Sequence, residues 1–229
     1  MGLNERVHAY IAAKYYVYLK ENFAERGQAA FRHATQYYAE QRGRRMAQRA
    51  IADGEALTFA TYRKYGEWVN TEASKSEGTA NRGETVSISP DYEVHVTVCP
   101  WHAQFRDMGL PDAGEAYCSD LDASICRGFN PYIRYETLQT LHRHTYCIQR
   151  VSDAGLSESE KPAKKEDGIR SFDYHCAHSY WSYREICAGI FGPAGEEIAR
   201  KVLRDLEEDY GSEAADIIRG YEGTDFNVN

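Results

Sequence analysis

The sequence predicts an α+β protein in which an antiparallel β-sheet is flanked by N-terminal and C-terminal helices. Apolar residues recur at helical spacing near both ends, and the middle of the chain alternates apolar and polar residues. Helices and strands do not alternate as in βαβ units. We expect one domain, with a helical region (1–66), a sheet region with inserted helices (67–151), a surface loop (152–170) and C-terminal helices (171–229).

The first quarter of the chain predicts three helices. Residues 3–26 place an apolar residue at every fourth position and end at Gly27. Residues 28–52 predict a second helix with a solvated face of arginines, namely Arg42, Arg44, Arg45 and Arg49. Residues 57–65 predict a third, short helix. This part carries no nucleophile or metal-ligand pattern, so we interpret it as scaffold.

The pattern then changes to that of strands. Residues 67–74 are strand-like and lead into a polar loop over 75–83. In residues 86–98, three valines alternate with polar residues, which is typical of a half-buried strand. Ser89-Pro90-Asp91 interrupts this segment, so it forms either two strands joined by a turn or one strand with an edge bulge.

The remaining elements follow a central segment, 99–131, which is treated separately below. Residues 132–140 and 145–151 predict a β-hairpin. Residues 152–167 are charged and lack apolar periodicity, which indicates a surface loop. Helices are expected over 171–191, 194–210 and 212–221.

The central segment from Cys99 to Pro131 concentrates residue types that perform chemistry. It predicts one helix over 101–108, and another over 113–127 that ends at Gly128. In the second helix, Cys118 and Asp122 are four residues apart and therefore share one face. The adjacent stripe of Tyr117, Leu121 and Ile125 would hold that face against the core.

Composition limits the class of protein. The net charge of -8 argues against a nucleic acid partner, because phosphate binding needs a basic face. No apolar run approaches the roughly 20 residues of a membrane span, and no signal peptide opens the chain. The six cysteines do not form the framework of a small disulfide-rich domain. We therefore expect a cytoplasmic protein with no nucleic acid or membrane partner. A homodimer is the candidate assembly.

Several segments, in order, resemble the L-2-amino-thiazoline-4-carboxylic acid hydrolase family. They are C-P-W-H-A-Q-F at 99–105, Y-C-S-D-L-D at 117–122, G-F-N-P at 128–131 and the strand residue Cys147. Segments at 174–180, 205–211 and 224–226 are also similar. The likeness covers most of the chain from about Gly54 onward and is weaker in the N-terminal helices.

The resemblance implies a hydrolase that acts on a non-peptide carbon–nitrogen bond of a small cyclic amidine or isothiourea, as in the ring opening of 2-amino-thiazoline-4-carboxylate. This sequence departs from the family pattern at Phe105, where a tryptophan is expected, and at Ile148-Gln149, where an acidic-aromatic pair is common. A third departure, the turn Leu141-His142-Arg143-His144, places two histidines and an arginine near the hairpin.

Hydrolysis of such a substrate needs a carboxylate for the protonated amidine, a nucleophile and a proton donor for the leaving atom. We assign these catalytic roles to Asp122, Cys118 and His178, and we expect the pocket to lie between the central segment and the helix over 171–191. Cys118 would attack the substrate or position the attacking water. Expected substrate-binding residues are Cys99, Trp101, His102, Asn130 and Arg134, with Asn130 donating to the tetrahedral centre and Arg134 holding a carboxylate.

Two alternatives remain open. Cys99 and His102, with Cys118 and Asp122, have spacings that suit zinc, which would then generate a hydroxide nucleophile. The absence of the paired Cys-x2-Cys signature argues against a zinc site. The expected cofactor is therefore none, with zinc or another divalent metal as the alternative. A non-catalytic protein that binds a small ligand is the other alternative. Cys126 and Cys187 are interpreted as core residues.

Overall fold

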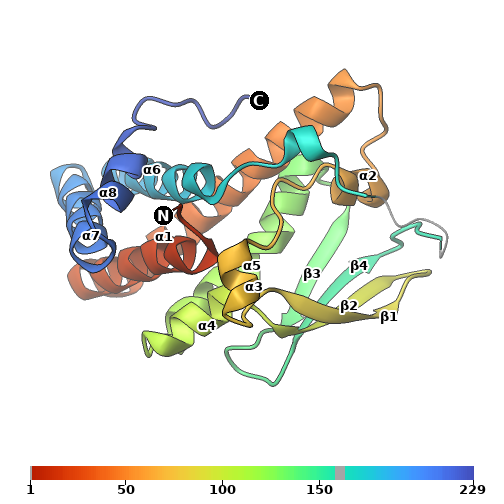
Figure 1. Ribbon diagram of the computed structural model, residues 1–229, viewed down its shortest axis with the longest axis horizontal. Helices are drawn as coiled ribbons and strands as arrows, with labels where there is room; N and C mark the ends of the chain where they lie inside the picture. The colour runs from red at the N-terminus through yellow and green to blue at the C-terminus, as the bar shows by residue number, and fades with distance from the viewer. Residues whose placement is uncertain (1, 158–162) are drawn as a thin grey trace.

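The computed structural model describes residues 2–157 and 163–229 and has the predicted α+β architecture (Figure 1). The bounds of its elements are α1 Glu5–Ala52, α2 Phe59–Lys64, α3 Glu72–Ser76, β1 Arg82–Ser87, β2 Tyr92–Val98, α4 Pro100–Asp107, α5 Pro111–Phe129, β3 Arg134–Gln139, β4 Cys147–Ser152, a 3₁₀ turn Glu166–Gly168, α6 Phe172–Phe191, α7 Pro193–Tyr210 and α8 Ser212–Arg219. The predicted surface loop over 152–167 lies partly outside the described residues.

Four antiparallel strands form one sheet in the order β1-β2-β4-β3. Val96 pairs with Cys147, and Thr137 pairs with Gln149, so these side chains lie on one face of the sheet. Residues of the opposite parity lie on the other face, where Arg150 donates to Glu93 at 2.6 Å. The predicted interruption at residues 89–91 is a turn between two strands.

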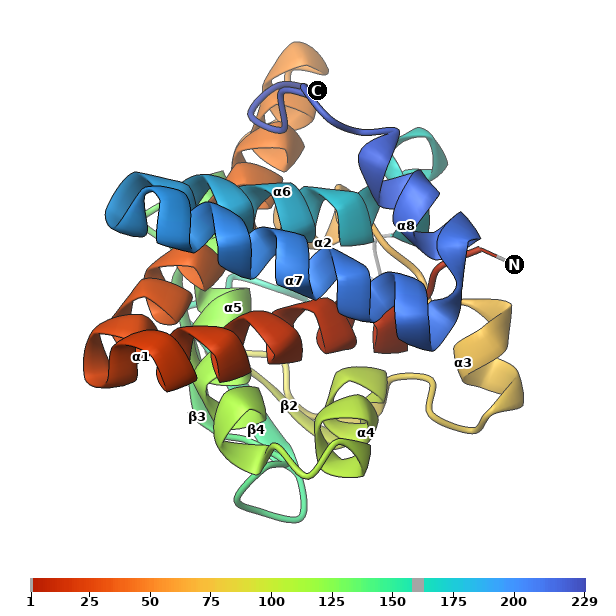
Figure 2. The same ribbon diagram turned by 90° about the vertical axis from the view of Figure 1, so that its left-hand side faces the viewer.

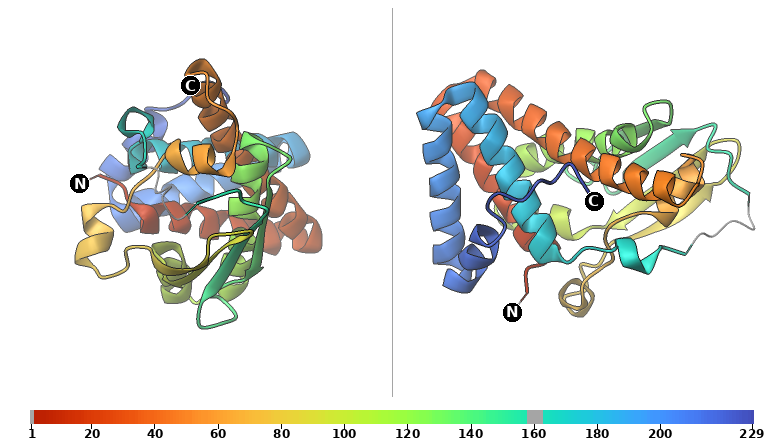
Figure 3. Two further views of the ribbon diagram at one scale, coloured as in Figure 1. Left: turned by 90° about the vertical axis from the view of Figure 1, so that its right-hand side faces the viewer. Right: turned by 90° about the horizontal axis from the view of Figure 1, so that it is seen from above.

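Helix α1 separates the two halves of the molecule. It contacts α5, which packs on the sheet through β3, and it also contacts α6 and α7. Figures 1 and 3 show α6, α7 and α8 on the side of α1 away from the sheet. The C-terminal helices therefore support α1, while α4 and α5 lie closer to the sheet.

The two predicted N-terminal helices are the two arms of α1. Ala24 has φ 48° and ψ -125°, outside the helical region, and the chain bends there (Figure 2). The first helix was predicted to end at Gly27, but this residue lies just after the bend. A Cβ on Gly27 would come 1.9 Å from the carbonyl oxygen of Leu19, so close backbone approach explains this glycine.

The prediction that the arginines of α1 form a solvated face was wrong for three of the four. Arg42, Arg45 and Arg49 are buried, and only Arg44 is exposed. The three buried guanidinium groups converge on the fully buried carboxylate of Glu67, at distances of 3.8, 2.8 and 3.0 Å. Burial alone would raise the pKa of Glu67, but Arg45, with Arg42 and Arg49, holds this pKa below its usual value.

The prediction of a strand over residues 67–74 was also wrong. Residues 67–71 have no regular structure, and α3 begins after Thr71, whose side chain accepts a hydrogen bond from the backbone N–H of Ser74. The buried carboxylate of Glu5 binds the backbone N–H of Thr71 at 2.8 Å. Tertiary contacts of two buried carboxylates thus determine the path of this segment.

The predicted end of α5 at Gly128 was wrong, because the helix continues through Phe129. Gly128 lies where α5 crosses α1, and a Cβ there would come 2.3 Å from the carbonyl oxygen of Glu40. On the facing helix, a Cβ on Gly43 would come 2.0 Å from the carbonyl oxygen of Ile125. Two glycines therefore bring the backbones of α1 and α5 into direct contact.

No helix within residues 2–157 and 163–229 combines the length and the apolar character that crossing a membrane requires.

Candidate active site

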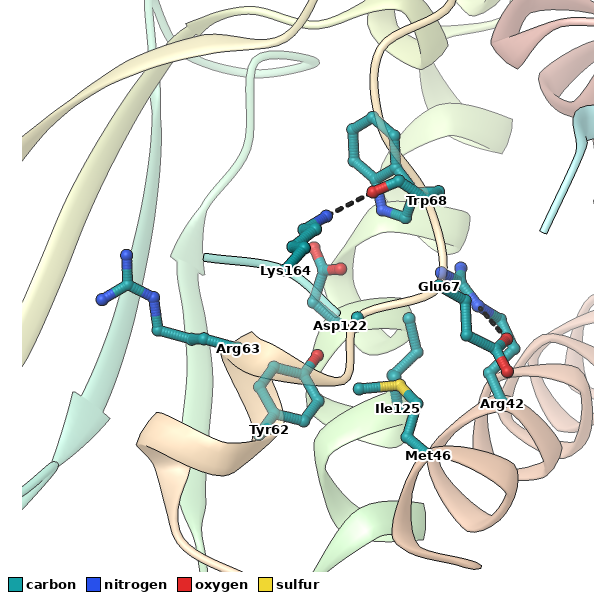
Figure 4. Close-up of a pocket in the computed structure, with 10 residues that line it drawn as sticks. Arg42, Met46, Tyr62, Arg63, Glu67, Trp68, Asp122, Ile125 and Lys164 are labelled. Atoms are coloured by element: carbon teal, nitrogen blue, oxygen red, sulfur yellow. Dashed lines mark hydrogen bonds and ion pairs between the residues drawn. The ribbon is translucent and has the colours of Figure 1, made fainter. Parts of the chain in front are cut away.

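A small cavity lies between α5, the inner face of the sheet and α1. It has a volume of about 80 Å³, while one water molecule needs roughly 10–15 Å³ on the same measure, so a small organic molecule fits. Its walls come from several elements and include Arg42, Trp68, Val96, Cys99, Trp101, Tyr117, Cys118, Leu121, Asp122, Thr137, Cys147 and Gln149. A second, more open cavity of about 240 Å³ adjoins it and shares Arg42, Trp68 and Asp122 (Figure 4).

Cys118 and Asp122 share one face of α5, as their spacing predicts, and both line the inner cavity. The side chain of Gln149 in β4 donates to Oδ2 of Asp122 at 2.8 Å. Burial raises the pKa of Asp122, while Arg42 and the Gln149 hydrogen bond act in the opposite direction. Burial also raises the pKa of the Cys118 thiol well above its usual value. A thiol and a carboxylate thus face the same enclosed space.

His142 is paired with Cys118. Nε2 of His142 lies 3.4 Å from Sγ of Cys118. Burial, together with the neighbouring His102 and Arg143, lowers the pKa of His142 to about 4. The imidazole is therefore neutral near pH 7 and can accept the proton of the thiol. The contact places a neutral proton acceptor beside the buried thiol.

The turn between β3 and β4 is fixed to α5, and this positions His142. The hydroxyl of Thr140 donates to Glu115, Arg143 donates to Asp112 at 2.6 Å, and the backbone N–H of Leu141 donates to Sγ of Cys147 at 3.2 Å. The His142 ring also contacts Phe105, with 5.6 Å between ring centroids. The imidazole is held from the turn, from α4 and from α5.

Gly114 in the first turns of α5 leaves the space that the imidazole occupies. A Cβ at this position would come 2.1 Å from Cε1 of His142. We expect Gly114→Ala to fold, because alanine is more favourable than glycine in a helix interior by up to about 1 kcal/mol. Displacement of the imidazole is expected to lower kcat for the hydrolysis proposed below by roughly 10²-fold, since a misplacement of about 1 Å has effects of this size. Steady-state kinetics measures this, and an unchanged kcat would show that the position of His142 does not matter.

The structure brings four of the eight predicted site residues to the inner cavity, namely Cys99, Trp101, Cys118 and Asp122. Cys99 precedes α4, and burial raises its pKa to about 12 against the opposing effect of the backbone N–H groups of His102 and Trp101. Trp101 donates from its indole N–H to Nδ1 of His8 at 2.9 Å, which fixes the ring. His102 lies next to the site, with its ring centroid 5.1 Å from that of His142.

The structure does not bring His178 to this cavity. Its side chain is fully buried in α6, where Nε2 lies 2.9 Å from Oε1 of Gln41 and Nδ1 lies 3.3 Å from Arg45. The ring of Phe226 stacks on it. No residue of α6 lines either of the two joined cavities. The prediction of a pocket between the central segment and α6 fails because α1 packs against both α5 and α6.

Asn130 and Arg134 do not line the inner cavity, and instead line a different surface cavity beside β3. The side-chain amide of Asn130 donates to the carbonyl oxygen of Leu57 at 2.8 Å and accepts from the backbone N–H of Tyr132. These contacts give Asn130 a structural role at the end of α5. Arg134 is exposed at the start of β3.

Sequence reasoning missed Arg42, His142 and Gln149. The unusual turn at 141–144 was the only sign of His142, and Ile148-Gln149 was noted only as a departure from a family pattern. Arg42 had no distinguishing sign, because its neighbours on α1 are also arginines. Its burial depends on Glu67, which is distant along the chain.

The zinc alternative drew on Cys99, His102, Cys118 and Asp122. In the part of the chain that the structure describes, no three or more His, Cys, Asp or Glu side chains form a group that could hold a metal ion. Zinc binding stays a prediction that elemental analysis of protein purified without chelator tests.

Comparison with known proteins adds one finding. A family model described as L-2-amino-thiazoline-4-carboxylic acid hydrolase matches residues 4–147, which is more than half of the chain. The match includes the N-terminal helices, where the resemblance was weak, and ends at the first residue of β4. Neither the comparison with curated proteins nor that with solved structures found a match.

Proposed function

Because this chain belongs to the L-2-amino-thiazoline-4-carboxylic acid hydrolase family, we propose that it hydrolyses a small cyclic amidine or isothiourea at the amidine carbon. The family is named for a hydrolase, and the substrate and the mechanism are our proposals. The observation that carries them is the pairing of Cys118 with His142 at 3.4 Å, with Asp122 in the same cavity. All three residues lie within the matched part of the chain.

Asp122 binds the substrate cation in this proposal. An amidine is most electrophilic at its central carbon when it is protonated, and a carboxylate stabilises the protonated form. Asp122 already accepts one hydrogen bond from Gln149, which fixes the orientation of the carboxylate and leaves further lone pairs for the amidinium N–H groups.

Cys118 acts as the nucleophile and His142 as the base in the first half of the reaction. His142 removes the thiol proton as Sγ forms a bond to the amidine carbon. The tetrahedral centre then collapses, and the ring bond to the leaving atom breaks. In an isothiourea the leaving atom is sulfur, and in an all-nitrogen ring it is nitrogen. The imidazolium returns the proton to that atom, so the ring is open and the carbon remains bound to Sγ.

Water completes the reaction in the second half. Neutral His142 removes a proton from a water molecule, whose oxygen adds to the carbon bound to Sγ. The carbon–sulfur bond to Cys118 breaks, and the thiol regains its proton from the imidazolium. The product carries a carbamoyl group, and the sum of the two halves is the addition of one water molecule to the substrate.

The test is incubation of the purified protein with L-2-amino-thiazoline-4-carboxylate. We expect a free thiol in reaction with a chromogenic disulfide reagent, and a product heavier than the substrate by one water in mass spectrometry. Ammonia release instead would show that the exocyclic bond is broken. A substrate that raises the melting temperature but is recovered unchanged would favour the non-catalytic ligand-binding alternative and contradict the proposal.

A further inference from the structure

The buried face of α1 carries more positive than negative charge. Arg42, Arg45 and Arg49 share one carboxylate, that of Glu67, and all four side chains are buried. Arg45 and Arg49 make the short contacts with both oxygens of Glu67. Arg42 makes only the long one, with Nε 3.8 Å from Oε2. Arg42 is therefore the guanidinium whose charge is least compensated.

Arg42 is also the member of this group that reaches the cavities. It lines both of them and is 5% exposed. Its Nε has no hydrogen-bond partner within the described residues, and its contact with the hydroxyl of Tyr38 is 3.5 Å long. A buried guanidinium with unused donors is costly unless an acceptor completes it. An anion bound in the cavity beside Arg42 would compensate the remaining charge of the guanidinium.

Asp122 faces the same space from the opposite helix. Figure 4 shows Arg42 on α1 and Asp122 on α5 separated across the cavity. Within the residues that the structure describes, the two charges form no ion pair with each other, although Arg42 opposes the effect of burial, which raises the pKa of Asp122. The cavity thus presents one cationic and one anionic group with space between them.

Resting on the proposed function, we propose that Arg42 binds the carboxylate of the substrate while Asp122 binds its amidinium. The ligand is then a zwitterion in which a carboxylate lies a few bonds from a cyclic amidine. Arginine suits this task because its planar donors match the two oxygens of a carboxylate. The role given to Arg134 in the sequence analysis is thereby assigned to Arg42. Arg63 and Lys164 in the outer cavity add positive charge along the approach.

Binding of two stable aromatic analogues tests this assignment. 2-Aminothiazole-4-carboxylate carries the anion, and 2-aminothiazole lacks it. We expect the wild type to bind the carboxylate more tightly, by calorimetry. We expect Arg42→Gln to weaken binding of the carboxylate by about 10- to 100-fold, with 2-aminothiazole affected less than 3-fold. The matched control is Arg44→Gln, an exposed position on the same helix that pairs with Glu40, and it should bind both analogues as the wild type does.

The Arg42→Gln variant is expected to fold, since Glu67 keeps Arg45 and Arg49 as partners. Arg42→Lys, which keeps the charge but not the paired donors, should bind the carboxylate with intermediate affinity. Equal losses for both analogues, or no loss, would overturn the assignment. So would a wild type that does not prefer the carboxylate, a result that depends on no variant. Binding without turnover of the thiazoline would instead remove the hydrolase proposal and leave the anion site in place.

Discussion

Replacing Cys118 with alanine is expected to lower kcat for hydrolysis of L-2-amino-thiazoline-4-carboxylate by about 10³-fold or more. The thiol is the only side chain in the proposed mechanism that forms a bond to the amidine carbon. No neighbouring residue replaces it directly, because the other two cavity thiols, Cys99 and Cys147, have no imidazole at hydrogen-bond distance within the described residues. Single-turnover and steady-state kinetics with the thiol assay measure the loss.

Cys126→Ala is the matched control for this prediction. Cys126 lies two helical turns further along α5 and is fully buried, but it does not line the inner cavity. Its loss should reduce stability slightly and leave kcat within a factor of about 3, because neither the thiol pair nor the cavity changes. Full activity of Cys118→Ala would end the nucleophile assignment.

The second large effect is expected for His142→Gln, with kcat lowered by about 10²- to 10⁴-fold, the usual range for loss of a general base. Glutamine preserves some volume but cannot accept the thiol proton. The pH profile gives an independent readout. Because burial lowers the pKa of His142 to about 4, the base is neutral above that pH and protonated below it. Activity should therefore persist at pH 6 and fall as the pH approaches about 4.

Asp122 contributes to the same acidic limb of the profile. Its carboxylate must be ionised to bind the amidinium, and burial raises its pKa, so protonation of Asp122 also lowers activity as the pH falls. His144→Gln is the control, since this exposed histidine lies two residues from His142 in the same turn. A loss of activity centred near pH 6.5, or equal losses in the two variants, would contradict the role of His142.

The periodicity of the sequence was sufficient to predict most of the fold. Apolar spacing located the arms of α1, the helices α4 to α8 and the β3–β4 hairpin, because each of these elements buries one regular face. The errors occurred where tertiary contacts override local patterns. Gly128 looks like a helix end but is a point of contact between helices, and residues 67–71 are held by the partners of Glu67 and Glu5 rather than by a strand ladder.

The site was predicted only in part, for a related reason. Cys118 and Asp122 are four residues apart on one helix, so their proximity follows from local geometry. The partner of Cys118 comes from a turn after β3, and the anion-binding arginine comes from α1, and no local pattern specifies either contact. His178 was chosen for its residue type, but α1 packs between its helix and α5, which places the imidazole elsewhere.

The glycine contact between α1 and α5 has a consequence for which molecules can react. Gly43 is next to Arg42 in the chain, and its close neighbour Ile125 is less than one helical turn from Asp122. The separation of the two backbones that carry these charges is thus set by direct contact of main chain with main chain. The site should therefore select ligands by the distance between their carboxylate and their amidine. One extra methylene between the acid and the ring should cost more affinity than a bulkier group elsewhere on the ring.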